Sequence, residues 1–273
     1  MHLPAWSQLW LLSQIEWQRL FLTRRGWLTI AASCLLWFVL LRYLVMPLSQ
    51  WMLDPAIIEG AEMVAGWVDV RQLLLWPRPE LSLFWLLALV LSPMAAVLFS
   101  AGQICRDRSR GTLRLYCLRI SRSSLLLGRF LGQLLVQGTL LALTMAASLA
   151  LAFWQGAALS LELLSAALFC WVFVMLCLLP FTALMSLMSV WLNSSRAAVS
   201  LAIVVLSVLP VVLGVLAYYW PGVLPLFGWL PGAQIPSLMN SQPWQSWAPL
   251  ALPVGQALLL LALSLYSFQR RGI

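Results

Sequence analysis

Six separate stretches of mainly apolar residues constrain the fold of this chain more than any other feature. They are residues 27–46, 83–103, 131–154, 163–192, 197–220 and 248–268. An α-helix needs about 20 such residues to cross the hydrocarbon core of a bilayer, which is about 30 Å thick. Apolar residue types make up 63% of the chain and charged residues only 9%, whereas about 25% of a soluble domain is charged. The sequence therefore predicts an all-α integral membrane protein whose residues 1–273 form a single domain with six transmembrane helices.

The distribution of arginine predicts the orientation of these helices. Segment 104–130 contains seven arginines and one acid, whereas segment 47–82 contains five acids and two arginines. Basic residues near the ends of spans are retained on the cytoplasmic side of a membrane. We therefore expect 104–130 and both termini to be cytoplasmic, and 47–82 to lie outside.

Two absences from the sequence exclude much chemistry. All 16 basic residues are arginines, and the single histidine is His2. A P-loop needs a lysine on the nucleotide phosphates, so this chain cannot itself be a conventional P-loop ATPase. We expect no catalytic residue, no metal site and no cofactor in the chain. Because the arginines lie in short segments between spans, anionic membrane lipid is the expected partner rather than nucleic acid.

The acidic residues bear on the source of energy. None of them lies in the middle of a predicted span, although transporters driven by protons or cations usually have an ionisable side chain there. This disfavours a self-powered secondary transporter or channel, and also an intramembrane enzyme. Coordination of Na⁺ by backbone carbonyls keeps the transporter alternative open.

Polar side chains recur along one face of the third span and one face of the fourth. They are Gln133, Gln137, Thr144 and Ser148, followed by Thr182, Ser186 and Ser189. Such side chains form hydrogen bonds between packed helices, which contribute about 0.6 kcal/mol each. We favour this packing interpretation, while a lining for a transport pathway or a dimer seam stays open.

Three further segments flank the spans. Residues 1–26 place Trp6, Trp10 and Trp17 on one side of a helix, which predicts an amphipathic helix at the membrane interface. Segment 47–82 predicts a self-contained outer loop, with docking of an outer-surface protein as the alternative. Segment 221–247 is apolar but is interrupted by prolines and glycines, which predicts an outer re-entrant segment.

The link between the second and third spans carries three short motifs in a fixed order. They read Asp107-Arg108-Ser109-Arg110-Gly111-Thr112-Leu113-Arg114, then Ser121-Arg122, then Leu127-Gly128-Arg129. This order resembles the type-2 ABC transporter permease family, in which an acid, Gly-Thr-Leu, a Ser-Arg step and Leu-Gly-Lys occur in turn. Arg129 replaces that lysine, and Ser109 and Arg110 stand where a glutamate is usual. With an N-terminal elbow helix and six spans, the resemblance covers the whole chain.

The resemblance implies a coupling helix that docks into a groove of a separate cytoplasmic ATPase. The residues that it assigns to coupling are Asp107, Arg108, Arg110, Gly111, Thr112, Leu113, Arg114, Ser121 and Arg122. Arginine suits this role because its forked guanidinium pairs with carboxylates, although a basic loop that only sets topology is the alternative. The resemblance further implies a homodimer in the bacterial inner membrane with two ATPase copies that bind ATP and Mg²⁺. ATP hydrolysis would then drive export of a substrate or work on an outer-surface partner.

Overall fold

The computed structural model describes residues 5–51, 73, 75–109, 111–118, 120–156, 160–240 and 250–270, and its regular structure within these ranges is entirely helical. Six of its helical segments are long and apolar enough to cross a membrane. They are Gly26–Gln50, Pro79–Ser100, Arg122–Trp154, Leu161–Trp191, Ser195–Tyr219 and Ala251–Arg270. The predicted all-α fold with six spans is therefore confirmed, and the chain is a multi-pass membrane protein.

The first two helices meet at a sharp corner. Helix α1 (Ala5–Leu22) is followed by α2 (Arg24–Leu40), and the hydroxyl of Thr23 accepts a hydrogen bond of 3.0 Å from the backbone N–H of Gly26. This side-chain cap satisfies a donor at the start of α2 that has no partner inside the helix. The span then continues through a short π-helix, η1 (Leu41–Val45), into α3 (Met46–Trp51). This corner allows α1 to pack against α9 (Arg122–Trp154).

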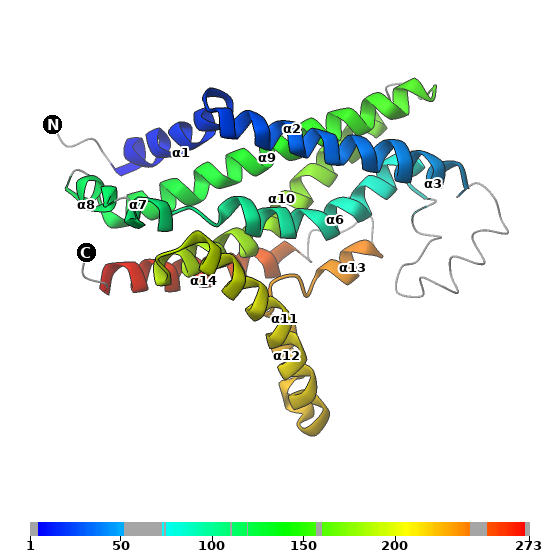
Figure 1. Ribbon diagram of the computed structural model, residues 1–273. Coiled ribbons are helices and arrows are strands. Elements are labelled where there is room, and N and C mark those ends of the chain that lie inside the picture. Colours follow the sequence, from blue (N-terminus) through cyan, green and yellow to red (C-terminus); the bar gives the residue numbers. More distant parts are fainter. Residues whose placement is uncertain are drawn as a thin grey trace.

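Four helices enclose the main core. They are α6 (Pro79–Ser100), α9 (Arg122–Trp154), α10 (Leu161–Trp191) and α14 (Ala251–Arg270), with α10 packed against the other three. Phe84, Trp85 and Phe173 are fully buried between α6 and α10. Figure 1 shows α1 and α2 along one side of this group.

Helix α11 (Ser195–Tyr219) packs weakly on its own chain. Its buried residues are Ala198 and Ala202, and in Figure 1 it projects away from the other helices together with α12 (Leu224–Phe227). The chain then returns to the core through α13 (Ile235–Met239), where the indole N–H of Trp85 donates to the carbonyl of Leu238 over 3.2 Å.

The two predicted outer segments are described only in part. From Pro221 to Asn240 the chain forms short helices and turns, as the prolines and glycines indicated, while re-entry into the membrane stays a prediction. Of the predicted outer loop, 52–72 and 74 lie outside the described residues.

Candidate functional site

The link between α6 and α9 consists of two very short helices. Helix α7 (Cys105–Ser109) and helix α8 (Thr112–Cys117) meet at Gly111, whose φ of 70° lies in the left-handed region. Glycine adopts this conformation without the strain that a Cβ introduces. The hydroxyl of Thr112 donates to the carbonyl of Asp107 over 3.2 Å and closes the turn. The Asp107–Gly111–Thr112 part of the motif therefore specifies a tight corner between α7 and α8.

We expect Gly111→Ala to lower the free energy of unfolding by about 1 kcal/mol, because alanine is strained in the left-handed region. A Cβ at Gly111 would meet no atom within 4 Å, so conformation is the cause of this cost. Thermal unfolding of the purified chain measures the effect. Gly222→Ala is the matched control, since Gly222 has equal space but no positive φ; equal stability of both variants would contradict the prediction.

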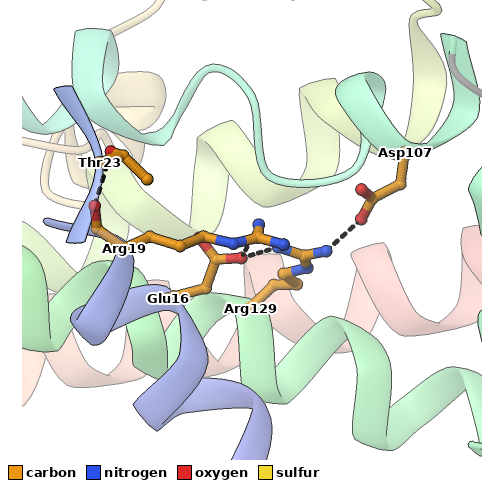
Figure 2. Close-up of polar contacts among 5 residues, drawn as sticks. All are labelled: Glu16, Arg19, Thr23, Asp107 and Arg129. Atoms are coloured by element: carbon orange, nitrogen blue, oxygen red, sulfur yellow. Dashed lines mark hydrogen bonds and ion pairs between the residues drawn. The ribbon is translucent and has the colours of Figure 1, made fainter. Parts of the chain in front are cut away.

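A series of four charged side chains connects the link to α1 and α9. Figure 2 shows the guanidinium of Arg129, on α9, between the carboxylates of Glu16, on α1, and Asp107, on α7. Glu16 also accepts a hydrogen bond of 2.9 Å from Arg19. Arg129 and Asp107 are only 6% and 9% exposed. Because two cations alternate with two carboxylates, the series, which we call the charge chain, is neutral overall.

Two glycines explain why α1 lies so close to α9. A Cβ at Gly128 would lie 2.7 Å from the Cβ of Leu12, and a Cβ at Gly132 would lie 2.6 Å from the Cβ of Glu16. Small residues four positions apart form a flat face on a helix, where a second backbone can approach closely. The indole of Trp17 also donates to the hydroxyl of Thr139 over 2.8 Å. This close packing positions Glu16 for its contact with Arg129.

Two arginines of the predicted coupling set contact the ends of other helices in the same chain. Arg108 donates to the carbonyl of Val190 over 2.9 Å, near the end of α10. Arg122 donates to the carbonyl of Gln269 over 3.0 Å, near the end of α14. The last carbonyls of a helix lack intrahelical donors and carry partial negative charge, so guanidinium groups stabilise them. Both arginines thus stabilise contacts between helices of their own chain. Their contact with an ATPase stays a prediction.

A cysteine adds to the contact between the link and α10. The thiol of Cys105 lies 3.4 Å from the carbonyl oxygen of Ser189 and 3.3 Å from that of Leu192. Burial raises the pKa of the Cys105 thiol. The side chain therefore acts as a protonated hydrogen-bond donor at neutral pH.

The remaining residues of the predicted coupling set differ in their surroundings. Leu113 is buried in a cluster with Leu12 and Phe268, and Ser121 accepts a hydrogen bond of 3.1 Å from the N–H of Ser124 at the start of α9. Arg110 and the side chain of Arg114 lie outside the described residues. Leu113 therefore anchors the link by burial against other helices, and Ser121 caps the start of α9.

The predicted coupling set leaves out four residues of this region, of which Arg129 was named in the motif but given no role. Glu16 and Arg129 form the centre of the charge chain. Leu115 and Leu118, which are 65% and 81% exposed, lie on the surface of the link. The two leucines could have been singled out from the sequence, because they are apolar residues in a segment rich in arginine. Exposed apolar side chains near one another are typical of surfaces that bind a partner.

The polar residues of the third and fourth spans mostly face into the chain. Gln137 donates to the hydroxyl of Ser100 over 2.9 Å and accepts from Thr182 over 3.1 Å. Ser186 donates to Gln103 over 2.5 Å. These hydrogen bonds join α6, α9 and α10, which supports the packing interpretation for Gln137, Thr182 and Ser186.

The other members of this polar set are not part of these interhelical bonds. Thr144 donates to the carbonyl of Leu141 over 2.9 Å, and Ser189 donates to that of Ser186 over 2.9 Å, each within its own helix. Ser148 is buried, and Gln133 is half-buried. Within the described part of the chain, no three His, Cys, Asp or Glu side chains are grouped closely enough to hold a metal ion.

The comparison with protein families agrees with the motif order and with this geometry. A model described as "ABC-2 family transporter protein" matches residues 10–273. The matched region includes Glu16, the link and all six long helices. No curated protein matches the chain as a relative. The chain therefore belongs to the ABC-2 family of transporter proteins and is a membrane permease subunit.

Proposed function

We propose that this permease couples ATP hydrolysis by a separate cytoplasmic P-loop ATPase to export of a substrate or to work on an outer-surface partner. The ATPase, present in two copies, binds ATP and Mg²⁺. Membership of the ABC-2 family supports this assignment. We place the protein in the bacterial inner membrane with both termini in the cytoplasm. Figure 1 supports this orientation, because the start of α1 and the end of α14 lie at the same end of the structure as α7 and α8.

The observation that carries the proposal is the bracing of the link. Asp107 connects it through Arg129 to α9 and α1, and Arg108 connects it to the end of α10. Arg122, the first residue of α9, contacts the end of α14. A displacement of the link by a closing ATPase is therefore transmitted to α1, α9 and α10, and through α9 to α14. A loop that only sets topology needs arginines but does not need these contacts.

The surface that we assign to ATPase docking is centred on Leu115 and Leu118. Both leucines are exposed on the side of the link that its own helices leave uncovered. Arg110 and Arg114 remain the proposed donors to carboxylates of the ATPase, and arginine is enriched at energetically important interface positions. The two leucines would hold the link in the groove of the ATPase, and the two arginines would fix its position along that groove.

The homodimer part of the proposal is supported by α11. This helix exposes apolar side chains on several sides, among them Val204, Val208 and Val211. Gln137 and Thr182, in contrast, are buried within one chain. We therefore assign the contact between two copies to α11 rather than to the polar residues of α9 and α10.

Affinity purification of the full chain from its native membrane in mild detergent tests the ATPase assignment. We expect a P-loop ATPase to co-purify at about one copy per permease chain. Leu115→Asp combined with Leu118→Asp should lower its recovery at least tenfold, because two charges replace leucines whose burial in an interface contributes about 1.5–3 kcal/mol each. Quantitative mass spectrometry of the eluate measures this ratio.

Gln269→Glu is the matched control, since it adds a negative charge at an exposed position at the same end of the structure. Its ATPase recovery should equal that of the wild type. Transport by reconstituted permease without any ATPase would contradict the proposal and would support the self-powered transporter.

A further inference from the structure

The first span, formed by α2 and η1, contacts the rest of the chain mainly along one line. Ile30 of α2 packs against Val136 and Leu140 of α9. Trp37 on α2, and Leu41 and Val45 on η1, are buried and recur every four residues, and the Trp37 ring centroid lies 4.9 Å from that of Phe84. Between residues 27 and 36 every side chain is exposed or half-buried. Helix α2 therefore stands away from α6 and α9 on either side of this line.

Two cavities lie beside α2. One, of about 420 Å³, lies between α2, α6 and α9, and the other, of about 430 Å³, lies between α2 and α9. Trp37 and Thr144 line both, so the two cavities are neighbours, and together we call them the α2 groove. It runs from Leu28 to Arg42, which is about 21 Å along the axis of the helix.

Three polar side chains that line the α2 groove already have hydrogen-bond partners within the chain. Ser92 donates to the carbonyl of Ala88, Thr144 donates to that of Leu141, and the amide of Gln137 bonds to two hydroxyl groups. The remaining lining is mainly aliphatic and aromatic. A polar ligand would lose its hydrogen bonds with water on entry and gain few in return. The lining therefore favours a hydrocarbon chain.

A positive charge stands at one end of the α2 groove. Arg42 lines the second cavity and lies on the π-helix η1, a form of backbone that is frequent at functional sites. Its guanidinium lies 6.0 Å from the ring centroid of Tyr43, and its Nη1 lies 3.2 Å from the sulfur of Met46. Arg42 forms no ion pair with any side chain that the structure describes.

The position of Arg42 along α2 matches the depth of a lipid phosphate. Arg42 follows Gly26, where the span begins, by 16 residues, which corresponds to about 24 Å of helix. Because the hydrocarbon core is about 30 Å thick, a long arginine side chain there reaches the headgroup region. Guanidinium groups bind phosphate through paired hydrogen bonds.

We propose that the α2 groove binds one anionic phospholipid, with an acyl chain in the cavity beside Arg42 and the phosphate on the Arg42 guanidinium. The second cavity extends from Cys34 to Arg42 along α2, about 12 Å, which is within the depth of one leaflet. The bound lipid fills the gap that α2 leaves and fixes the spacing between α2 and α9. This site depends on the membrane location of the chain and not on its transport activity.

Native mass spectrometry of the purified full chain tests the proposal. The chain is equilibrated with vesicles of equal parts phosphatidylglycerol and phosphatidylethanolamine, then extracted in mild detergent. We expect the wild type to retain one phosphatidylglycerol in preference to phosphatidylethanolamine. Arg42→Gln should lower this preference about fivefold, the contribution of one basic residue near a lipid surface. Ala147→Phe, which fills the second cavity, should remove the retained lipid.

Two variants serve as matched controls. Arg78→Gln removes an arginine just before α6 that does not line the α2 groove, and Ala146→Phe adds the same ring to the neighbouring exposed position of α9. Both should retain phosphatidylglycerol as the wild type does. Ala150→Phe, in the same cavity, is a second filling variant should Ala147→Phe fail to fold.

Three results would overturn the assignment. One is equal retention of the two lipids by the wild type, which would show that the site does not select an anionic headgroup. Another is an unchanged preference in Arg42→Gln, and the last is equal lipid loss in the folded Ala146→Phe and Ala147→Phe chains. Selective loss in Ala147→Phe together with the lowered preference of Arg42→Gln would support it.

Discussion

Arg129→Met is expected to lower the free energy of unfolding by about 3–5 kcal/mol, the cost of removing one partner from a buried ion pair. Methionine keeps an unbranched apolar side chain, although a shorter one, and leaves Glu16 and Asp107 without the cation that now lies between them. Thermal unfolding in detergent and the fraction of monodisperse chain after extraction measure the loss. The effect should be among the largest of any single substitution in the chain, because both carboxylates lose the same partner.

Two companion variants separate charge from packing. Arg19→Gln removes an exposed member of the charge chain and should cost no more than about 1 kcal/mol. The triple variant Glu16→Gln, Asp107→Asn and Arg129→Met removes all the buried charges and should regain most of the lost stability, as other buried ion networks do when they become neutral. Unchanged unfolding of Arg129→Met, or a triple variant less stable than the single one, would contradict the prediction.

Gly132→Leu is expected to displace α1 from α9 and to lower the free energy of unfolding by about 1–3 kcal/mol, the typical cost of overpacking. The Cβ alone would lie 2.6 Å from the Cβ of Glu16, so the two helices must separate. This movement also draws Glu16 away from Arg129, which adds to the loss. Thermal unfolding measures the stability, and the rate of protease cleavage within residues 5–22 measures the release of α1.

Gly255→Leu is the matched control for this substitution. Gly255 also lies inside a long apolar helix, α14, but a Cβ there would meet no atom within 4 Å. Leucine should be tolerated at this position and should raise helix stability slightly, since glycine is a poor helix former. A slow, wild-type rate of α1 cleavage in Gly132→Leu would show that α1 does not depend on this close packing.

The six spans could be predicted from the sequence because a bilayer demands a minimum apolar length, but the starts of the helices could not. Helix α9 begins at Arg122, nine residues before the apolar stretch at 131, since Ser121 caps it and Arg122 contacts the end of α14. Helix α6 begins at Pro79 rather than at 83. Caps and tertiary contacts set these starts, and hydropathy does not report them.

The candidate site was predictable where its causes are local. Gly111 and Thr112 define the corner of the link by their own backbone conformation and hydrogen bond. The contact between Glu16 and Arg129 depends instead on how α1 packs on α9, which charge counting does not reveal. Its signal was the spacing of Gly128 and Gly132, which marks a face where another helix can approach.

The charge chain also imposes an order on the biosynthesis of this protein. Glu16 leaves the ribosome 113 residues before Arg129, an interval of roughly 10 s at ordinary rates of translation. During that time the first two spans enter the membrane while α1 has neither its glycine face nor Arg129. Docking of α1 is therefore a late event in assembly, and a nascent chain that stops before the third span leaves Glu16 with only the exposed Arg19 of its own helix as a partner.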